Sequence, residues 1–362
     1  MATILARTAA LCAAALLAVP AAHSQQATTS QPQTLLATPT TVAWGYYSAR
    51  AKPVLTIKSG DTVTIQTLST CGAPERLKTI GIPESDIPAY VTEIYTKVPA
   101  SEKGPGGHIL TGPVAIEGAE PGDILELRIQ KINIDVPWAC NSFGAGRGFL
   151  PNDFPYSHSR LIPLDREKMI GHFAPGIDIP LHPFFGSMGI APPESAGKYN
   201  SAPPWMHGGN MDNRELVAGT TVYYPVNAKG ALFEAGDGHA NQGNGEVDIT
   251  ALETQLTGTF QFIVHKAQPG DARLLWPRAE TPTQYIAMGF DEDLKTATEM
   301  AIRNMITFLS QQNPGLPHMT RDDAYALISV ACDVDITQLV DTKSGVHVMC
   351  PKNLFTAPAA AH

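Results

Sequence analysis

The chain has few charged residues for its length and no run of basic ones. Lys and Arg number 25 against 34 Asp and Glu, charged residues make up 16% of the 362 positions, and the formal net charge is -9. Binding to nucleic acid requires clustered Lys and Arg, often with interleaved aromatic residues, and no such stripe occurs in this sequence. We therefore expect no nucleic-acid partner.

Beyond its N-terminus, the chain lacks an apolar run long enough to span a bilayer. The N-terminus itself has one positive charge before an apolar stretch from Thr8 to Val19, followed by Pro20 and the small-residue pattern Ala22-His23-Ser24. This pattern is typical of a secretory signal peptide. We interpret residues 1–24 as a signal peptide cleaved near Ser24-Gln25, and we expect a periplasmic or secreted protein without a stable membrane anchor.

Several motifs of known hydrolases and nucleotide-binding proteins are missing. No serine lies in a Gly-x-Ser-x-Gly elbow, and there is no Gly-Ser-Ser-rich run of the kind found in Ser-Ser-Lys amidases. The glycines of "GAGRG" (144–148) do not lie between a strand and a helix, as a phosphate-binding loop requires. Among the cysteines, only Cys140 in "PWACNSFG" has a setting worth considering for a nucleophile.

Cysteine is sparse, with five residues, of which Cys12 lies in the signal peptide. The other four would reach a compartment in which disulfides persist: Cys71, Cys140, Cys332 and Cys350. Four cysteines allow three pairings. Closeness in sequence favours a bond between Cys332 and Cys350 across one hairpin, and buried free thiols are the alternative.

The composition favours turns and strands over long helices, because the chain has 31 Gly and 30 Pro. Period-two alternation predicts a hairpin over 53–67 and a similar layout over 113–135, where a change of phase indicates a β-bulge near Lys131. Further strands are predicted at "TTVYYPV" and "TFQFIVHK". Residues 136–215 are rich in Gly, Pro and aromatics, and we expect them to be largely loops.

Two segments late in the chain have helical spacing. Apolar residues recur at helical intervals from Leu294 to Leu309, and a second helix is predicted over 321–331 with Thr320 as its N-cap. Residues 25–41 are polar and Thr-rich and predict a flexible lead-in. We expect a mainly β protein with a small C-terminal helical pair, in one catalytic region over 42–356 with a tail at 357–362.

The stretch "GDGHANQGNGEVDIT" (236–250) places an Asp, a His and a Glu among glycines. Asp237 and His239 are two residues apart, so in an extended segment both side chains lie on the same face. The glycines that follow allow Glu246 to return to the same point. Imidazole and carboxylate are zinc ligands, and a position left open for water would make a hydrolytic centre. The alternative interpretation is a tight surface turn.

Two further clusters place potential ligands beside glycine. "HGGNMDN" (207–213) sets Asn210 and Asp212 two residues apart, and "GPGGHILTGPV" (104–114) places His108 just before a predicted strand. Beside glycine, the backbone can approach a small ligand closely. Each histidine alone is more typical of a hydrogen-bonded structural residue, but three such clusters in one chain favour a common site.

Several blocks of the chain resemble, in order, those of the acetamidase/formamidase family. They include "GGHILTGPVAIEGAEPGDILELRI", "HPFFGSMGIAPP", "HGGNMDN", "VYYPVNAKGALFEAGDGHANQGNGEVDITALET" and "CDVDITQLVD". The resemblance extends from about Val42 to Phe355. It implies hydrolysis of a short linear amide to ammonia and a carboxylate, β-sandwich and barrel-like subdomains, assembly into a homo-oligomer, and a bound divalent metal, for which we expect zinc, with calcium as the alternative.

Carried over residue by residue, the resemblance implies a site formed by His108, Asn210, Asp212, Asp237, His239 and Glu246. We expect Asp237 and His239 to hold the metal, helped by Asn210 or Asp212. Glu246 would act as the general base for a water activated by the metal. His108 would protonate the leaving nitrogen, because an amine departs poorly as an anion.

Three alternatives remain open from the sequence. One is a non-catalytic exported β-sandwich module that binds a small amide or a cation, since fold alone does not define function. Glu246 could attack as a nucleophile, with the metal in a structural role. An exported enzyme could also serve a larger amide, for which the aromatics of "GYYSAR" and "APPWM" would provide a differently shaped pocket.

Overall fold

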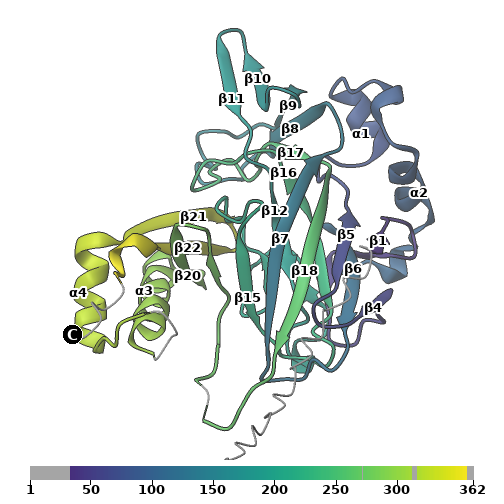
Figure 1. Ribbon diagram of the computed structural model, residues 1–362. Helices are drawn as coiled ribbons and strands as arrows, with labels where there is room; N and C mark the ends of the chain where they lie inside the picture. The colour runs from purple at the N-terminus through teal and green to yellow at the C-terminus, as the bar shows by residue number, and fades with distance from the viewer. Residues whose placement is uncertain (1–32, 271, 312–315, 357–362) are drawn as a thin grey trace, which may run out of the picture. The chain divides into compact units, whose positions relative to one another are not determined.

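Two large β-sheets, one of nine strands and one of eleven, make up most of the protein (Figure 1). The computed structural model describes residues 33–270, 272–311 and 316–356. The expectation of a mainly β fold with a small C-terminal helical pair is confirmed. The predicted signal peptide (1–24), the first part of the lead-in (25–32) and the tail (357–362) lie outside the described residues.

The nine-stranded sheet joins segments from both ends of the described chain. Its strands are β1 (Gln33–Leu35), β5 (Thr62–Gln66), β7 (Ile124–Ile134), β15 (Thr221–Pro225), β18 (Leu256–His265), β19 (Arg278–Glu280), β20 (Gln284–Asp291), β21 (Asp333–Asp341) and β22 (Lys343–Pro351). They lie in the order β1-β5-β18-β7-β15-β19-β20-β22-β21. All neighbours are antiparallel except β1 and β5.

The eleven-stranded sheet carries the segments that the sequence singles out for chemistry. Its strands are β2 (Val42–Trp44), β4 (Leu55–Ile57), β6 (Ile109–Ile116), β8 (Trp138–Phe143), β9 (His158–Asp165), β10 (Ile170–Ala174), β11 (Ile177–Pro180), β12 (Phe184–Gly189), β14 (Gly208–Asn210), β16 (Phe233–His239) and β17 (Glu253–Thr254). The main path is β11-β10-β9-β8-β17-β16-β12-β14, and β6 joins it at β16 and also pairs with β2 and β4.

The smaller elements complete the fold. A two-stranded ladder pairs β3 (Tyr46–Tyr47) with β13 (Tyr199–Asn200). The helices are α1 (Pro74–Thr79), α2 (Ala89–Lys97), α3 (Leu294–Ser310) and α4 (Arg321–Ala331), with short 3-10 turns at η1 (Glu84–Asp86), η2 (Ala100–Glu102), η3 (Glu194–Ala196) and η4 (Lys352–Leu354). Helices α1 and α2 were not expected from the sequence; each begins directly at or after a proline.

The main hydrophobic core lies between the two sheets. Phe260 of β18 packs against Phe185 of β12 and Phe233 of β16, with ring centroids 5.5 and 5.7 Å apart, and all three side chains are fully buried. Leu127 of β7 belongs to the same cluster. Burial of these side chains from facing sheets gives the sandwich-like arrangement that the resemblance implies.

The predicted hairpin over 53–67 is wrong, although both of its strands exist. β4 pairs in parallel with β6, whereas β5 pairs with β1 and β18, so the turn at 58–61 connects the two sheets. Ile57 and Val63 are both buried in the core between the sheets. Residues 113–135 repeat this arrangement, because β6 and β7 also belong to different sheets. Alternation predicts a strand, but it does not specify the partner.

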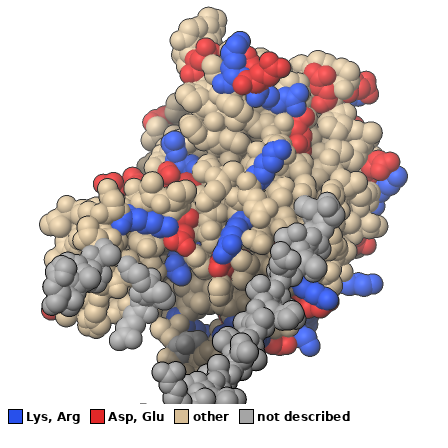
Figure 2. Space-filling view, in the orientation of Figure 1, with Lys and Arg blue, Asp and Glu red and all other residues tan. Residues whose placement is uncertain are grey.

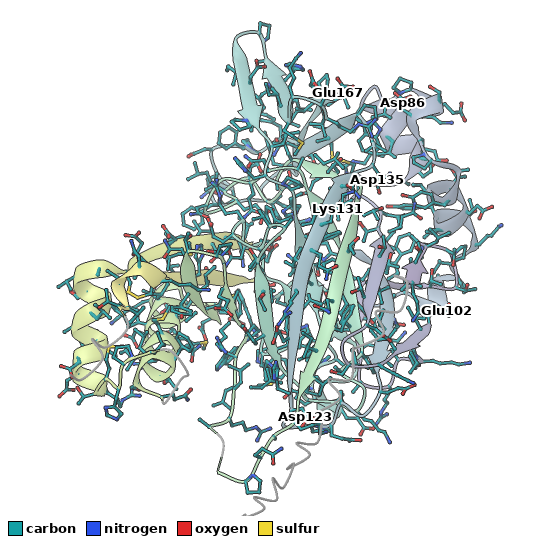
Figure 3. The ribbon with its side chains drawn as sticks, in the orientation of Figure 1. Asp86, Glu102, Asp123, Lys131, Asp135 and Glu167 are labelled. Carbon is teal, nitrogen blue, oxygen red and sulfur yellow. A yellow bond between two sulfur atoms is a disulfide. The ribbon has the colours of Figure 1, made fainter. Side chains whose placement is uncertain are left out.

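The β-bulge near Lys131 is confirmed. Lys131 pairs with Thr259, but the next residue of β18, Phe260, pairs with Ile129, so one residue of β7 is unmatched. Figure 3 labels Lys131 on β7 beside β18. The extra residue shifts the apolar side chains from Ile129 to Ile132 without turning them away from the core.

The late helical pair is also confirmed. Thr320 caps α4 by accepting a hydrogen bond of 3.1 Å from the Asp323 amide. Ala297 and Ala301 of α3 pack against β20 and β22 in a separate hydrophobic cluster. Figure 1 shows both helices together beside β20 and β22.

Two expectations about irregular regions are wrong. Regular structure begins before Val42, because β1 pairs with β5 and buries Leu35 to 7% exposure and Ala37 to 1%. The segment 136–215, expected to be largely loops, contains the strands from β8 to β14. These strands are short and interrupted by Gly and Pro, so alternation does not reveal them.

Both pairs of cysteines form disulfides, which excludes the alternative of free thiols. Cys332 bonds to Cys350, as closeness in sequence favours, and Cys71 bonds to Cys140 across a separation of 69 residues.

On the face drawn in Figure 2, Lys and Arg lie singly or beside Asp and Glu. Among the described residues, no helix has both the length and the apolarity needed to cross a membrane.

We predict that His347 makes the fold sensitive to acid. The ring is buried in β22, Nδ1 lies 2.7 Å from Thr337 Oγ1, and burial, with Arg214 nearby, lowers the pKa to about 4. Asp335 Oδ2 lies 3.9 Å from Nε2. Because the unfolded chain takes up this proton near pH 6.5, stability falls between pH 6.5 and 4, by about 1.4 kcal/mol per pH unit from this residue.

Denaturant unfolding at several pH values measures this effect. His347→Gln should flatten the decline of unfolding free energy between pH 6.5 and 4.5, because the variant has no imidazole to protonate. His318→Gln, at an exposed histidine, is the matched control and should leave the decline as steep as in the parent. Equal slopes for His347→Gln and the parent would contradict the prediction.

Candidate active site

Four adjacent strands bring the candidate site together. In the order β14, β12, β16 and β17 they carry Asn210, Gly186, the pair Asp237 and His239, and Glu253. Cross-strand register places Glu253 directly opposite His239. The sheet therefore gathers residues that lie up to 67 positions apart in sequence, from Gly186 to Glu253.

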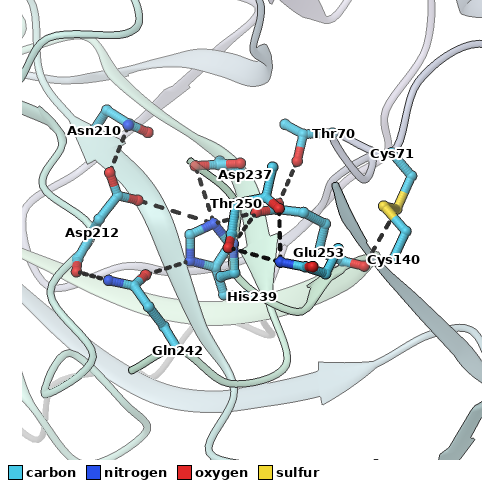
Figure 4. A network of polar contacts seen from close by, with 12 residues as sticks. Thr70, Cys71, Cys140, Asn210, Asp212, Asp237, His239, Gln242, Thr250 and Glu253 are labelled. Atoms are coloured by element: carbon cyan, nitrogen blue, oxygen red, sulfur yellow. Dashed lines mark hydrogen bonds and ion pairs between the residues drawn. A yellow bond between two sulfur atoms is a disulfide. The ribbon is translucent and has the colours of Figure 1, made fainter. Parts of the chain in front are cut away.

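The imidazole of His239 is the centre of the cluster (Figure 4). Its Nε2 atom lies 3.3 Å from Asp237 Oδ2, 3.3 Å from Glu253 Oε1 and 4.0 Å from Asp212 Oδ1. All four side chains are at most 5% exposed. Three carboxylates thus converge on one ring nitrogen away from bulk solvent.

The other nitrogen of His239 is held by Gln242. Gln242 Oε1 lies 3.0 Å from Nδ1, and the Gln242 amide group donates to the Asp212 carbonyl at 2.8 Å. Since the amide oxygen can only accept, Nδ1 carries the proton, and a neutral ring has its lone pair on Nε2. This tautomer directs a ligand nitrogen at the carboxylates.

Asn210 and Asp212 lie on the side of His239 opposite Glu253 (Figure 4). Asn210 Nδ2 donates to Asp212 Oδ2 at 2.6 Å and to Asp341 Oδ2 at 3.2 Å. Asn210 Oδ1, Asp212 Oδ1 and His239 Nε2 are buried and have no hydrogen-bond partner. Buried polar atoms without partners are costly, so such a group is suited to binding a ligand.

Gly186 of β12 leaves the space between these groups open. A Cβ atom at this position would lie 2.6 Å from Asp237 Oδ2 and still closer to Asp212 Oδ1. Real Cβ atoms do not approach oxygen atoms so closely. Any larger residue at position 186 would therefore occupy the point toward which the carboxylates are directed.

Three of the acidic residues have left-handed backbone conformations. The φ angles are 47° at Asp212, 55° at Asp237 and 42° at Glu246. Non-glycine residues adopt this region rarely, at a cost of about 1–3 kcal/mol each. Such strain is common at functional sites, where the surrounding structure holds it in place.

Glu246 reaches the cluster from the loop after β16. Ligand atoms of Asp212, His239 and Glu246 all lie within 4.8 Å of one another, as do those of Asp237, His239 and Glu253. The Gly245 amide donates to the Thr337 carbonyl of β21 at 3.0 Å. The neighbouring sheet therefore fixes the loop that the glycines allow to fold back.

His108 lies directly before β6 and faces Asp237. Its Nε2 atom lies 3.8 Å from Asp237 Oδ2, and its Nδ1 atom lies 3.1 Å from the Ser201 carbonyl oxygen. A carbonyl can only accept, so Nδ1 carries a proton. A ring protonated on both nitrogens would face the Asp237 carboxylate with Nε2.

Burial and mutual repulsion shift the pKa values of these acids. Burial, followed by repulsion from Glu246, raises the pKa of Asp212 well above its usual value, and burial and Asp341 do the same for Glu246. Burial also opposes ionisation of Asp237, but His108 and His239 outweigh it and hold that pKa low. For His239, burial lowers the pKa, but Glu253 and Asp237 raise it well above its usual value. The cluster thus contains more carboxyl groups than can be ionised together without a cation.

The donor atoms fit a divalent metal ion. Two ligands held tetrahedrally at about 2.0–2.1 Å from zinc stand about 3.3 Å apart. His239 Nε2 lies 3.3 Å from Asp237 Oδ2 and from Glu253 Oε1. One imidazole with carboxylates suits zinc, and the many carboxylate oxygens are also compatible with calcium.

The structure brings all six predicted residues into this region: His108, Asn210, Asp212, Asp237, His239 and Glu246. The sequence did not assign Glu253, Asp341, Gln242 or Gly186. All four lie in the sequence blocks quoted for the family resemblance, but neither type nor spacing separated them from their neighbours. Their roles follow from pairing between distant strands.

A profile of the Acetamidase/Formamidase family matches residues 103–201 and 194–357. The formamidase of Methylophilus methylotrophus is 29% identical in an alignment 191 residues long that covers 39% of this chain and 47% of that protein. The acetamidase of Mycolicibacterium smegmatis is 26% identical in an alignment 202 residues long that covers 39% of this chain and 49% of that protein. The matched part thus spans about half the length of these curated relatives.

The crystal structure of an acetamidase from Bacillus halodurans has a similar fold over most of the chain. It aligns with a TM-score of 0.72 and 27% sequence identity, and the alignment covers 89% of this chain and 98% of that one. The likeness therefore extends over most of this chain and nearly all of that one.

We predict that Gly186→Ala weakens metal binding while leaving the protein folded. The added Cβ would displace oxygens of Asp212 and Asp237, the proposed ligands themselves, so the affinity should fall by at least the roughly 10–100-fold that loss of an outer partner of a metal ligand causes. Calorimetric titration with Zn²⁺ measures the dissociation constant. Gly107→Ala is the matched control, because a Cβ there meets nothing within 4 Å. Equal affinity in the two variants would show that this space is not where the metal binds.

Proposed function

The chain belongs to the Acetamidase/Formamidase family, and we propose that it hydrolyses the carbon–nitrogen bond of short linear amides to ammonia and a carboxylate. The observation that carries this proposal is the buried cluster of carboxylates around His239 Nε2. It combines metal-ligand atoms with spare proton-transfer groups, Glu246 and His108. A module that only bound a cation would need the ligands but not the additional acid and base.

Asp237 and His239 would hold the metal, with help from Asp212 and Asn210. Glu253 joins them as a further ligand, because its Oε1 atom lies as close to His239 Nε2 as Asp237 does. We propose zinc, with calcium as the alternative. When bound, the metal would polarise the amide carbonyl and lower the pKa of water toward ~7.

Glu246 is the proposed general base. Its carboxylate lies within the same group of ligand atoms as Asp212 and His239, so it can take the proton of the attacking water at the reacting carbonyl. Burial raises the pKa of Glu246 in the structure without a metal. A nearby cation would favour the ionised carboxylate that a base requires.

His108 is the proposed general acid. The Ser201 carbonyl fixes the ring through Nδ1, and Nε2 lies 3.8 Å from Asp237 Oδ2, facing the cluster. A proton on Nε2 can pass to the leaving nitrogen, so that ammonia departs as a neutral molecule. His108 and Glu246 reach the cluster from different segments of the chain.

The aromatic residues of "GYYSAR" and "APPWM" support the proposal of a larger amide. Tyr199 and Trp205 stack with ring centroids 5.2 Å apart, and β13, which contains Tyr199, pairs with Tyr46 and Tyr47 of β3. The same segment continues to Ser201, which contacts His108. The Tyr199 and Trp205 rings would contact the acyl part of a substrate bulkier than formamide.

Export and assembly are part of the same proposal. The two disulfides, Cys71–Cys140 and Cys332–Cys350, are typical of an oxidising compartment and support export through the N-terminal signal peptide.

Exposed apolar side chains gather in the loop after β8, at Phe149, Leu150, Phe154 and Tyr156. Such patches are typical of protein contacts, which supports a homo-oligomer.

Ammonia release from formamide, acetamide, propionamide and a bulkier aryl amide tests the activity. We expect activity to disappear after dialysis against a chelator and to return with Zn²⁺, because the carboxylates need the cation. Activity that is indifferent to the chelator would move the chemistry to a nucleophile such as Glu246. No ammonia from any amide would favour the binding module, and equal rates on formamide and the aryl amide would exclude the larger pocket.

Glu246→Gln tests the general base. Loss of a positioned base typically lowers kcat about 10²–10⁴-fold. We expect this loss with the Zn²⁺ content retained, and Glu117→Gln, at an exposed position, should behave like the parent. Loss of Zn²⁺ from the Glu246 variant would make Glu246 a ligand instead of the base.

Intact mass and light scattering of the protein expressed with its own N-terminus test export and assembly. We expect a mature chain that begins near Gln25 and a particle mass of two or more chains. A retained N-terminus would contradict the proposed signal peptide, and a mass of one chain would contradict the oligomer.

A further inference from the structure

Glu253 presents its two carboxylate oxygens to different partners. Oε1 lies 3.3 Å from His239 Nε2 and accepts a hydrogen bond of 2.8 Å from the Ala251 amide. Oε2 accepts a short hydrogen bond from the hydroxyl of Thr70. The hydrogen bonds from Thr70 and from the Ala251 amide therefore together orient the Glu253 carboxylate so that Oε1 faces the imidazole.

Thr70 lies in the connection between β5 and α1, outside any strand or helix. The next residue, Cys71, is bonded to Cys140, and both cysteines are 1% exposed. Cys140 of β8 lies directly opposite Glu253 of β17 in the sheet. Figure 4 shows Thr70, the disulfide and Glu253 side by side. The disulfide thus ties the Thr70 segment to the strand that is paired with Glu253.

We propose that Thr70 is a positioning residue that orients Glu253 toward the His239 metal site, and that the Cys71–Cys140 disulfide holds Thr70 in place. The inference rests on the proposed function, because it assigns Glu253 to the metal of the amidase centre. The segment that carries Thr70 and Cys71 then contributes to the site, although Cys71 lies 69 residues from Cys140 in sequence.

The physical reason is the softness of the carboxylate torsion. The terminal torsion of a glutamate is broad and roughly two-fold, so packing alone does not fix the plane of its oxygens. A hydroxyl that donates to one oxygen fixes this plane and leaves the other oxygen for the metal, as partners of metal ligands generally do. Threonine suits this task, because its β-branched side chain is stiff at χ1.

Thr70→Val removes the hydroxyl but keeps the shape of the side chain. We expect the dissociation constant for Zn²⁺, measured by competition with a chromophoric chelator, to rise about 10–100-fold with little change in melting temperature. Thr70→Ser restores the donor and should return the dissociation constant to within about threefold of the parent, the remainder reflecting its freer χ1.

The two disulfides provide matched variants. Cys71→Ala with Cys140→Ala should weaken Zn²⁺ binding in the same direction as Thr70→Val. Cys332→Ala with Cys350→Ala removes the other disulfide, which joins the end of α4 to β22, and should leave the Zn²⁺ dissociation constant unchanged despite a lower melting temperature. Since the Thr70 variants keep both disulfides, they test the inference even if a cysteine variant fails to fold.

Unchanged Zn²⁺ affinity in Thr70→Val would overturn the positioning role of Thr70. Equal weakening by both cysteine pairs would overturn the specific role of the Cys71–Cys140 disulfide, because general loosening of the fold would then suffice. A parent that binds no Zn²⁺ overturns both this inference and the metal-dependent function. A parent that binds Zn²⁺ but releases no ammonia overturns the amidase function alone, and the Zn²⁺ affinities of the variants still decide the inference.

Discussion

The site depends on one constraint: several buried carboxylates share a single imidazole nitrogen. Asp237 and Glu253 both lie 3.3 Å from His239 Nε2, and Asp212 lies 4.0 Å away. Removing one carboxylate from water without compensation costs several kcal/mol, so this arrangement requires a cation or shared protons. The raised pKa of Asp212, caused by burial and by Glu246, has the same origin. A divalent metal would satisfy both the charge and the unpartnered atoms.

The rest of the fold holds this unfavourable group of charges together. Gln242 fixes the tautomer of His239, and Gly186 leaves the central space open. Asp212 and Asp237 remain in left-handed conformations that cost about 1–3 kcal/mol each, which local interactions alone would not maintain. The close-packed core between the two sheets, with Phe260 near its centre, provides the rigidity that keeps these residues in place.

The site is also assembled from segments that belong to different parts of the fold. β21 of the nine-stranded sheet contributes Asp341, and through Thr337 it fixes the loop that carries Glu246. A disulfide brings Thr70 beside Glu253 from the connection before α1. Because each segment is anchored in a separate element, the ligand atoms are placed by the packing of both sheets and not by one flexible loop.

The sequence by itself determined the features that depend on local spacing. Alternation located β7 with its bulge, helical periodicity located α3 and α4, and the spacing of Asp237 and His239 placed both on one strand. Only the tertiary structure decided that β4 and β5 join different sheets and that Glu253 lies opposite His239. Periodicity reports which face of an element is buried, whereas the partner of a strand is set by packing against residues far away in the chain. The position of Glu253 in the ligand cluster arises from that strand pairing, and no local sequence pattern encodes it.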